Sequence, residues 1–542
     1  MKILGIQEYG PDASAALVEN NKVLFAAEEE RFNRIKHYAG FSFNGDAPTN
    51  SIDFCSSKGH DKIANGWNMK PKDTFNLLIR GAINNITNRG SRHAQAYSIK
   101  NTLLGHSIGL LRRKFFLNKL GSNMINHHRA HAAFARVSGF KKANVIVVDG
   151  AGERESISLF SYNNNQIELI KSFDFKSSLG QLYEYVTYLL GLGFFGEGKT
   201  MALSSFGKYN EKFNDLIRID KNKAEIKINW KKAKKLNKFS RNEPEPITAI
   251  HKDIAFMLQY QLEKTVEFLK DYLYNKTGYK NLCVSGGVAL NCKMNSFLFN
   301  SDNVKEIYVP SAPHDGGVSL GAAIELTSKE SYPLEKLTSA YHGPSFNNQY
   351  IKEFMDNNKI KYEILENVES EAAHLISKGN IIGWFQGNME FGPRALGNRS
   401  ILSDPTNPQI KDRVNKTKHR YLWQPLAPAI LEEKQSKYFE EKQSSHFMSF
   451  ALKIKEKKKD EIPSVCHIDK TARIQTVSKT TNPIFYKLIS EFNKVSGTPI
   501  ILNTSFNSKG VPIVCTPQDA YSEFRKMGLD CLIMNNFLIR KN

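Results

Sequence analysis

Short hydrophobic runs separated by polar turns mark the N-terminal part of the chain, and their lengths are typical of β-strands. Three such runs come in quick succession, and a second group of three follows further along. The predicted strands cover residues 2–7, 13–18 and 22–27 in the first group and residues 144–148, 156–162 and 166–173 in the second. Strand starts are offset by 11 and 20 residues in the first group and by 12 and 22 in the second. This coarse internal repeat predicts a duplicated subdomain.

Two halves of this kind, each with a mixed sheet and with a nucleotide held between them, describe the actin and sugar-kinase type of α/β fold. Hydrophobic residues at helical spacing predict long helices over residues 181–190 and 250–274. The segment HGPSFNNQ is rich in glycine, proline, serine and asparagine, a composition that is typical of a domain boundary. We therefore predict an N-terminal domain over residues 1–342 and a separate C-terminal α/β domain over residues 343–542.

Two histidines four residues apart, His127 and His131, lie in an alanine-rich segment that is predicted to be helical. Four residues are about one helical turn, so both imidazoles leave the same face. A predicted strand ends on Asp149, and a second strand-end carboxylate follows at Asp315. Two imidazoles with carboxylates from strand ends make a divalent-metal site. The alternative is ordinary polar residues on a helix surface, because the zinc-protease glutamate is absent beside the first histidine.

Paired glycines follow two predicted buried strands, the strand over residues 281–284 and the strand over residues 307–309. A strand that enters a Gly-Gly turn and then a helix lets backbone N–H groups approach a phosphate closely. Glycine also ends strands for purely structural reasons, but two such turns in short succession favour a nucleotide site. The glycines concerned are Gly286, Gly287, Gly316 and Gly317.

The segment from Gly193 to Thr200 matches the phosphate-loop expression GxxxxGK[ST]. A true phosphate loop follows a buried strand and opens a helix. Here the preceding YEYVTYLLGL is predicted to be helical, so we reject that reading. Lys199 remains a candidate phosphate contact within another fold.

The C-terminal part carries several basic side chains among glycine, serine and asparagine, and this pattern predicts an anion pocket. Arginine matches phosphate or carboxylate with two hydrogen bonds at once. The alternative, for any single residue, is a surface salt bridge. A predicted strand over residues 500–502 also leads into small polar side chains suited to a carbonyl or amide. The candidates are Arg394, Arg399, Lys418, Arg420, Arg473, Asn503 and Ser505.

Composition is ordinary for a globular protein, with 41% hydrophobic and 24% charged residues in 542. Apolar runs are too short for a bilayer span, no signal-peptide core is recognisable, and no two of the six cysteines form a CxxC pair. We expect a cytoplasmic protein without membrane partners. The net charge of +21 comes largely from lysine runs at residues 220–241 and 453–460. Solvated loops explain these runs better than a nucleic-acid partner does, and a positive field also suits phosphorylated substrates.

Ten segments together resemble the O-carbamoyltransferase family that includes nodulation protein U and the antibiotic-tailoring carbamoyltransferases. They span residues 12–507 in the family's order. The segments are DASAALV, AEEERFNRIKH, NHHRAHAAFA, VVDGAGE, GEGKTMALSSFG, SGGVALNCKMN, PSAPHDGGVSLGAA, FGPRALGNRSIL, RYLWQPLAPAIL and GTPIILNTSFN. The resemblance implies an N-terminal actin-like domain of the ASKHA type, related to the tRNA threonylcarbamoyl-transfer enzyme, and a C-terminal YrdC-like α/β domain.

The resemblance also implies a reaction. The C-terminal domain would release carbamate from carbamoyl phosphate, and carbamate would attack ATP to give carbamoyl adenylate and pyrophosphate. An acceptor hydroxyl of a sugar, glycan or natural product would then take the carbamoyl group at the metal-bearing N-terminal site. Shelter within one protein suits such a hydrolytically fragile intermediate. No motif identifies the acceptor, because acceptor choice depends on the cleft loops at residues 38–125 and 211–248, which carry no chemical signature. The sequence also leaves the oligomeric state open, and a homodimer is one possibility.

Residue roles follow from the matched motifs. The metal, Fe²⁺ by preference with Mg²⁺ or Mn²⁺ as alternatives, would be held by His127, His131, Asp149 and Asp315. The nucleotide would contact Lys199, Gly286, Gly287, Asn291, Gly316 and Gly317. Carbamoyl phosphate would contact Arg394, Arg399, Lys418, Arg420, Arg473, Asn503 and Ser505. Catalytic roles near the transferred group would fall to Lys36, His37 and Asp12.

One departure from the family pattern concerns position 11, where relatives usually carry histidine before DASAAL and this chain has Pro11. Another base, such as His37, would have to replace that histidine, or the chain would be a non-catalytic binding protein. A different alternative is an RNA-modifying enzyme of the tRNA threonylcarbamoyladenosine type. The basic charge favours that reading, whereas the carbamoyltransferase spellings GPRALGNRSIL and LNTSFN disfavour it.

Overall fold

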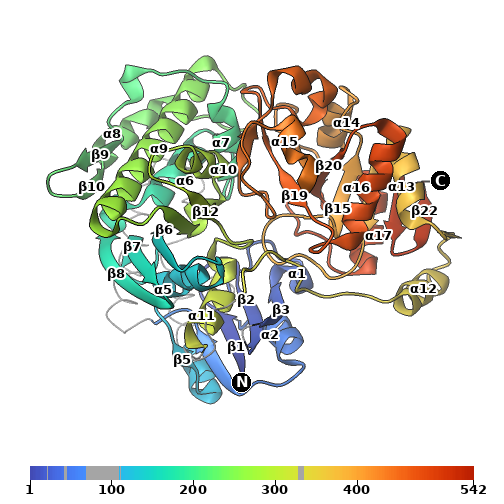
Figure 1. Cartoon of the computed structure of the whole chain (residues 1–542), viewed down its shortest axis with the longest axis horizontal. Coiled ribbons are helices and arrows are strands. Elements are labelled where there is room, and N and C mark those ends of the chain that lie inside the picture. The colour runs from blue at the N-terminus through green and yellow to red at the C-terminus, as the bar shows by residue number, and fades with distance from the viewer. Residues whose placement is uncertain (21, 42–45, 69–108, 110–111, 328–334, 542) are drawn as a thin grey trace. The chain divides into compact units, whose positions relative to one another are not determined.

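The structure is a computed structural model that describes residues 1–20, 22–41, 46–68, 109, 112–327 and 335–541. The chain forms two compact units (Figure 1). The first comprises residues 1–33 and 37–337, and the second comprises residues 34–36 and 338–542. Most of the predicted cleft loop at residues 38–125 lies outside the described residues.

The first sheet of the N-terminal unit has five strands in the order β3-β2-β1-β4-β5. The central strand β1 pairs antiparallel with β2 and parallel with β4. Apolar side chains of β1 and β2, among them Leu4 and Leu17, are buried against one another and explain the hydrophobic runs. The strands are β1 (Lys2–Gln7), β2 (Ser14–Glu19), β3 (Lys22–Glu28), β4 (Lys62–Asn65) and β5 (Asn123–Met124).

The second sheet repeats this plan in the order β12-β11-β6-β7-β8. Its central strand β6 pairs antiparallel with β7 and parallel with β11. Each sheet therefore has a hairpin on one side of its central strand and parallel strands on the other, so the predicted duplication and the actin-like α/β class are confirmed. The strands are β6 (Lys142–Val148), β7 (Glu155–Asn163), β8 (Gln166–Asp174), β11 (Asn281–Ser285) and β12 (Glu306–Tyr308).

Helices of this unit follow the predicted periodicity closely. The two long helices predicted from spacing are α6 and α9, and α9 runs from a capping box at Thr248 to a left-handed Gly278. The helices are α1 (Glu30–Asn33), α2 (Thr49–Ser56), α5 (His127–Ala132), α6 (Leu179–Leu189), α7 (Glu197–Ser204), α8 (Trp230–Lys234), α9 (Ala249–Thr277), α10 (Cys292–Phe299) and α11 (Val318–Leu326). A small hairpin, β9 (Ile217–Asp220) with β10 (Glu225–Ile228), precedes α8.

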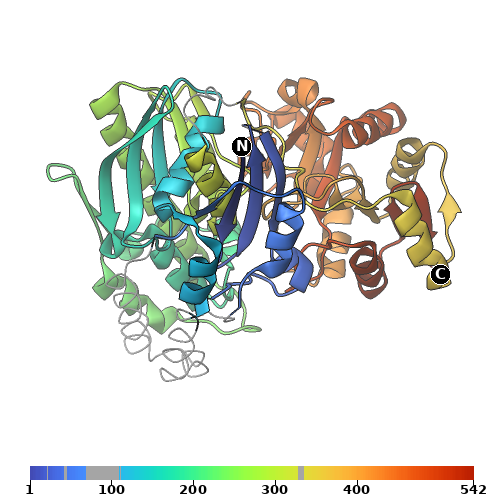
Figure 2. The ribbon, with the colours of Figure 1, turned by 90° about the horizontal axis from the view of Figure 1, so that it is seen from below.

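Helix α11 lies between the two sheets of the N-terminal unit (Figures 1 and 2). It packs against β1 and β2 of the first sheet and against α5 beside the second. Small side chains make this approach possible: a Cβ atom on Gly5 would overlap the carbonyl oxygen of Ser319, and one on Gly321 would overlap that of Ala130. The backbone of α11 is therefore in direct contact with both repeats.

The C-terminal unit is built on an eight-stranded mixed sheet in the order β13-β22-β21-β14-β15-β20-β16-β19. Its strands are β13 (Glu363–Ile364), β14 (Ile382–Phe385), β15 (Arg399–Ser403), β16 (Ala427–Leu431), β19 (Gln475–Val477), β20 (Ile500–Ser505), β21 (Cys531–Met534) and β22 (Phe537–Arg540), with β17 (Ala451–Lys453) and β18 (Thr471–Arg473) as a separate pair. Its helices are α12 (Asn348–Asn357), α13 (Val368–Ser377), α14 (Ile410–Thr417), α15 (Gln435–Tyr438), α16 (Pro483–Ser496) and α17 (Pro517–Met527). The α/β class predicted for this part is confirmed, whereas its likeness to YrdC stays a prediction.

The core of this unit lies where α13 and α16 cover the sheet around Trp384. Phe492 of α16 is fully buried there, so Phe492→Ala is expected to cost about 3–5 kcal/mol through lost burial and a residual cavity. Hydrogen exchange of β14 and β20 amides, followed by mass spectrometry on the full chain, measures this loss. The matched variant Val495→Ala, on the exposed side of the same helix, is expected to change it by less than about 0.5 kcal/mol. Equal protection in both variants would contradict the assignment of this core.

No helix among the described residues is both long enough and apolar enough to span a membrane.

Candidate metal and transfer site

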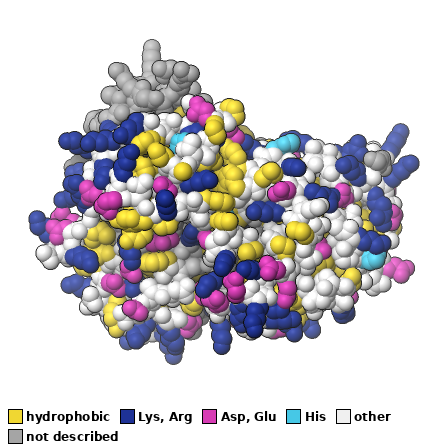
Figure 3. Space-filling view, turned by 90° about the horizontal axis from the view of Figure 1, so that it is seen from above, with side chains coloured by type: hydrophobic (Ala, Val, Ile, Leu, Met, Phe, Trp, Pro, Cys, Tyr) yellow, Lys and Arg dark blue, Asp and Glu magenta, His cyan; other side chains and the backbone are white. Residues whose placement is uncertain are grey.

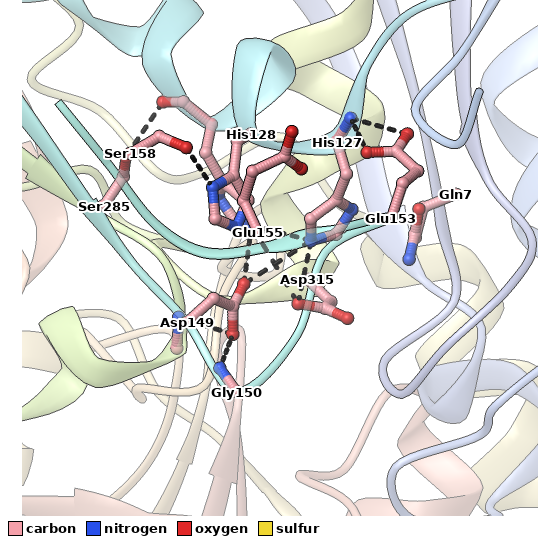
Figure 4. Close-up of polar contacts among 12 residues, drawn as sticks. Gln7, His127, His128, Asp149, Gly150, Glu153, Glu155, Ser158, Ser285 and Asp315 are labelled. Atoms are coloured by element: carbon pink, nitrogen blue, oxygen red, sulfur yellow. Dashed lines mark hydrogen bonds and ion pairs between the residues drawn. The ribbon is translucent and has the colours of Figure 1, made fainter. Parts of the chain in front are cut away.

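Four side chains of types that can ligate a metal ion converge between the two sheets of the N-terminal unit. His127 and His131 lie on α5, Asp149 follows β6, and Asp315 precedes α11. The Nε2 atoms of the histidines are 3.2 Å apart. Oδ2 of Asp149 lies 3.4 and 3.2 Å from them, and Oδ1 of Asp315 lies 3.5 and 3.9 Å away. Figure 4 shows both carboxylates turned toward His127.

Local structure fixes the position of the histidines. Asn126 caps α5 by accepting a hydrogen bond from the backbone N–H of Arg129. The carboxylate of Glu153 accepts hydrogen bonds from the backbone N–H of His127, at 2.9 Å, and from the side chain of Asn126, at 2.7 Å. A carboxylate at a helix N-terminus is also favoured by the helix dipole. The start of α5 is therefore held in place from outside the helix.

The position of Asp149 is fixed by the glycine turn that follows β11. Its Oδ1 atom accepts hydrogen bonds from the backbone N–H of Gly150, at 2.7 Å, and of Gly287, at 3.4 Å. Gly286 has φ +90°, and a Cβ atom there would overlap the carbonyl oxygen of Val148. Only glycine allows this approach of the turn to β6. The turn predicted to contact a nucleotide thus also aims the other carboxylate oxygen at the imidazoles.

Burial makes the charges of this cluster depend on one another. Both histidine side chains are 0% exposed. Burial lowers the pKa of His127, but the carboxylates of Asp315 and Asp149 outweigh it and raise that pKa to about 10. Burial and the charge of Asp149 raise the pKa of Asp315. The two carboxylates therefore repel each other and need positive charge between them.

The donor set fits a divalent cation. Ligand atoms bonded to one ion at roughly 2.0–2.2 Å lie about 3.0–3.6 Å from one another, which is the spacing of most atom pairs in this cluster. Two imidazoles and two carboxylates suit iron, zinc or manganese better than calcium. The Nδ1 atoms of His127 and His131 have no hydrogen-bond partner among the described residues, so their Nε2 atoms are the ones aimed at the centre.

A second cluster of polar side chains surrounds Asp12. Its Oδ1 atom lies 2.7 Å from Nδ1 of His37, and its Oδ2 atom lies 3.6 Å from Nε2 of His314. Burial alone would raise the pKa of Asp12, but His314 and the hydrogen bond with His37 outweigh it and bring the pKa to about 2. Glu28 lies 3.5 Å from His314 and pairs with Arg31. Asp12 is therefore held as a carboxylate.

Sequence reasoning did not single out His314, Glu28 or Glu153. His314 stands directly before Asp315, and Glu28 lies in the quoted segment AEEERFNRIKH. Their spacing in the sequence does not mark them as site residues. The signal that could have identified them was their position next to residues that were already candidates.

The predicted nucleotide contacts lie on several elements of the N-terminal unit. Gly316 and Gly317 adjoin Asp315, so they share a turn with the candidate metal ligands. Asn291 caps α10, and its side chain also pairs with Gln259 at 2.8 Å. Lys199 lies on α7, and its ammonium group donates to the carbonyl oxygen of Leu192.

A helix, α6, precedes the segment that matches the phosphate-loop expression. No strand enters it from the N-terminal side, so the rejection of a true phosphate loop agrees with the structure.

Several basic residues of the C-terminal unit lie around Lys418. Lys418 is buried, whereas Arg420 and Arg473 are half-buried. Its ammonium group donates to the carbonyl oxygens of Ser505 and of Asn507, the latter at 2.7 Å. Burial and the positive charges of Arg420 and Lys36 hold the pKa of Lys418 well below its usual range. Burial together with neighbouring Arg473 lowers the pKa of Arg420 to about 10. Such clustering of like charges is unfavourable unless an anion joins it.

Two other predicted anion contacts are occupied by protein groups. The guanidinium group of Arg399 donates to four backbone carbonyl oxygens and lies 3.7 Å from the ring centroid of Phe385. The amide of Asn503 donates to Ala395 O and Gln475 Oε1. Arg394 is half-buried, in the loop between β14 and β15. The side chains of Arg399 and Asn503 therefore hold the loop between β14 and β15 by its backbone oxygens.

The chain thus combines a duplicated actin-like unit that carries a candidate metal centre with an α/β unit that carries a cluster of basic residues. The carbamoyltransferase N-terminus family model matches residues 2–324, and the carbamoyltransferase C-terminus model matches residues 373–541. The chain therefore belongs to the carbamoyltransferase family and is a carbamoyl-transfer enzyme.

Curated relatives agree with this assignment. Nodulation protein NolNO of Sinorhizobium fredii is 35% identical over 98% of this chain and 79% of its own length. Nodulation protein NolO of Bradyrhizobium diazoefficiens is 37% identical over 77% of this chain and 79% of its own length. Among solved structures, full-length HypF in its phosphate- and nucleotide-bound form is 14% identical over 60% of this chain and 55% of that chain, with a TM-score of 0.36. So distant a likeness adds nothing to the family match and the strand topology.

Proposed function

We propose that this protein makes carbamoyl adenylate from carbamoyl phosphate and ATP, and then transfers the carbamoyl group to an acceptor hydroxyl. The observation that carries the proposal is the convergence of His127, His131, Asp149 and Asp315 within 4.8 Å, next to glycine turns suited to phosphate. Membership of the carbamoyltransferase family supports the group that is transferred.

The basic cluster of the C-terminal unit is the proposed site for carbamoyl phosphate. Lys418, Arg420 and Arg473 would pair with its phosphate, and Lys36, which is grouped with the same unit, would add positive charge. A dianion there would counter the burial and the neighbouring positive charges that lower the pKa values of Lys418 and Arg420. Ser505 lies next to the Lys418 ammonium group and would hydrogen-bond the carbamoyl end. Arg394, Arg399 and Asn503 would shape the surrounding loop.

The four-ligand cluster of the N-terminal unit is the proposed metal site. Fe²⁺ suits its two imidazoles and two carboxylates, and Mg²⁺ or Mn²⁺ are alternatives. A divalent cation there would offset phosphate charge and polarise a carbonyl group. The backbone N–H groups of the turns at Gly286–Gly287 and Gly316–Gly317 would bind nucleotide phosphates, with Asn291 and Lys199 beside them.

Pyrophosphate release tests the first half of the proposal. The protein is expected to release pyrophosphate from ATP when carbamoyl phosphate is present and to release none without it. Incubation with a panel of sugars and glycans is expected to yield a product heavier by about 43 Da, the carbamoyl increment. ATP turnover that does not depend on carbamoyl phosphate would contradict the proposed order of steps.

The positive charges of the chain are dispersed over its surface, and this distribution gives little support to the alternative of an RNA-modifying enzyme. Lysine and arginine side chains are spread over the face shown in Figure 3 among carboxylates, rather than gathered in one continuous patch. Many lysines of the run at residues 220–241 are exposed around β10 and α8. Such charges are typical of a solvated surface. A tRNA affinity that falls steeply with salt would revive this alternative.

A further inference from the structure

A cavity of about 720 Å³ lies at one edge of the second sheet of the N-terminal unit, where three parallel strands begin. These strands are β6, β11 and β12, which start at Lys142, Asn281 and Glu306. The candidate metal ligand Asp149 follows the opposite end of β6, about 20 Å away at the usual rise of strand residues. The cavity is therefore separate from the metal site. Its wall consists of Ser138, Gly139, Phe140, Lys141, Lys142, Asn164, Asn281, Glu306 and Lys336.

Two segments of this wall that are distant in the sequence are bound to each other. The backbone N–H of Leu337 donates a hydrogen bond to the carbonyl oxygen of Val137 at 2.8 Å. The stem of Lys336 lies against Gly139, because a Cβ atom added to that glycine would be only 3.2 Å from the Cβ atom of Lys336. The backbone therefore holds the lysines of both segments at the cavity before any ligand binds.

The cavity carries an excess of positive charge. Lys141, Lys142 and Lys336 line it with exposed side chains, and Glu306 is the single acidic residue in the described part of its wall. None of the three ammonium groups forms an ion pair with a described carboxylate. That of Lys142 instead lies 5.7 Å from the ring centroid of Tyr279. Like charges around one cavity repel one another, and a bound phosphate group offsets this repulsion.

The rest of the wall suits an organic group joined to that phosphate. Phe140 offers apolar surface, although its side chain is only 9% exposed. The Nδ2 atom of Asn281 donates to the carbonyl oxygen of Lys142 at 3.2 Å, whereas its Oδ1 atom has no hydrogen-bond partner among the described residues. Asn164, in the turn between β7 and β8, adds a second amide. Pockets of about 300–1,000 Å³ enclose small organic ligands, so the volume indicates more than a single ion.

We propose that this cavity binds a small organic phosphate of about the size of a nucleoside monophosphate. Its phosphate pairs with Lys141, Lys142 and Lys336, and its organic part covers Phe140 and hydrogen-bonds to Asn281. The bound ligand joins the segment that follows the histidine-bearing helix α5 to the residues that precede the C-terminal unit in the sequence. This binding site goes beyond the proposed carbamoyl transfer and does not depend on it.

Hydrogen exchange of the full chain, followed by mass spectrometry, tests the site with AMP and glucose 6-phosphate as probes. A probe at ten times its dissociation constant is expected to slow exchange of residues 137–142 and 335–337 about tenfold. These segments distinguish the cavity from the glycine turns, where AMP bound as a nucleotide would protect other residues. Inorganic phosphate is expected to bind at least tenfold more weakly, and adenosine is expected to protect neither segment. Absence of protection by both organic phosphates, or equal affinity for inorganic phosphate, would overturn the proposal.

Charge variants assign the protection to this cavity. Lys141→Gln and Lys336→Gln are each expected to raise the probe concentration for half-maximal protection about tenfold, because each removes a charged hydrogen bond to phosphate. Glu306→Gln removes the negative charge of the wall and is expected to lower that concentration about threefold, a gain that a damaged fold cannot produce. The control Lys305→Gln changes an exposed lysine outside the wall and is expected to behave as wild type. Wild-type affinity in all four variants would overturn the assignment.

Discussion

Asp315→Asn is expected to remove the bound metal and to lower carbamoyl transfer about 10³-fold. The side chain keeps its size but loses the negative charge that balances a cation between His127, His131 and Asp149. A metal ion contributes several kcal/mol of charge stabilisation during such a transfer, and about 1.4 kcal/mol corresponds to each factor of ten in rate. Metal content by plasma mass spectrometry and transfer to a sugar acceptor are the two measurements.

Asp302→Asn provides the control for this variant, because that aspartate is exposed on the same unit. It is expected to keep full metal content and activity. The thermal unfolding of both variants shows whether the fold is retained. An Asp315→Asn protein that is folded, binds metal in equal amount and transfers at the wild-type rate would rule out the four-ligand centre.

Lys418→Gln is expected to lower pyrophosphate release that depends on carbamoyl phosphate about 10³-fold while metal content stays unchanged. The ammonium group is buried within the basic cluster, and its donors already face the backbone oxygens of Ser505 and Asn507. A charged hydrogen bond to phosphate contributes about 1.5–3 kcal/mol. The loss is larger where the backbone segment that the lysine holds also becomes less ordered. Initial rates with ATP in excess and carbamoyl phosphate varied measure the loss.

Two further variants make this prediction decisive. Lys416→Gln changes an exposed lysine two residues away and is expected to behave as wild type. Arg473→Gln removes a half-buried arginine of β18 and is expected to raise the KM for carbamoyl phosphate about 10–100-fold without loss of fold. Wild-type kinetics in both Lys418→Gln and Arg473→Gln would exclude the basic cluster as the carbamoyl phosphate site.

The duplicated fold was predictable because the hydrophobic runs of the two repeats have similar lengths and similar offsets along the sequence. The helical spacing of His127 and His131 likewise placed both imidazoles on one face. Asp149 directly follows β6 as predicted, whereas Asp315 lies seven residues beyond the end of β12, in the turn that opens α11. In both cases a short-range pattern reports directly on the arrangement in space.

Other features had no short-range signal. The pairing of Asp12 with His37 depends on two left-handed residues, and neither aspartate nor histidine marks such a conformation in sequence. Arg399 resembled an anion ligand by composition, yet backbone oxygens from three separate stretches of chain surround its guanidinium group. The strand order of the C-terminal sheet could not be predicted either, because its neighbours are set by contacts between distant segments.

Close packing of α11 has a consequence for how the N-terminal unit can move. Asp315 stands at the start of this helix, Gly321 rests on the backbone of Ala130 in α5, and Ser319 rests on Gly5 of β1. Because the backbones are in direct contact, we expect α11, α5 and β1 to move together as one rigid body. Any movement of the two repeats against each other therefore has to bend the chain elsewhere, and we expect His127, His131 and Asp315 to keep their mutual spacing during such a movement.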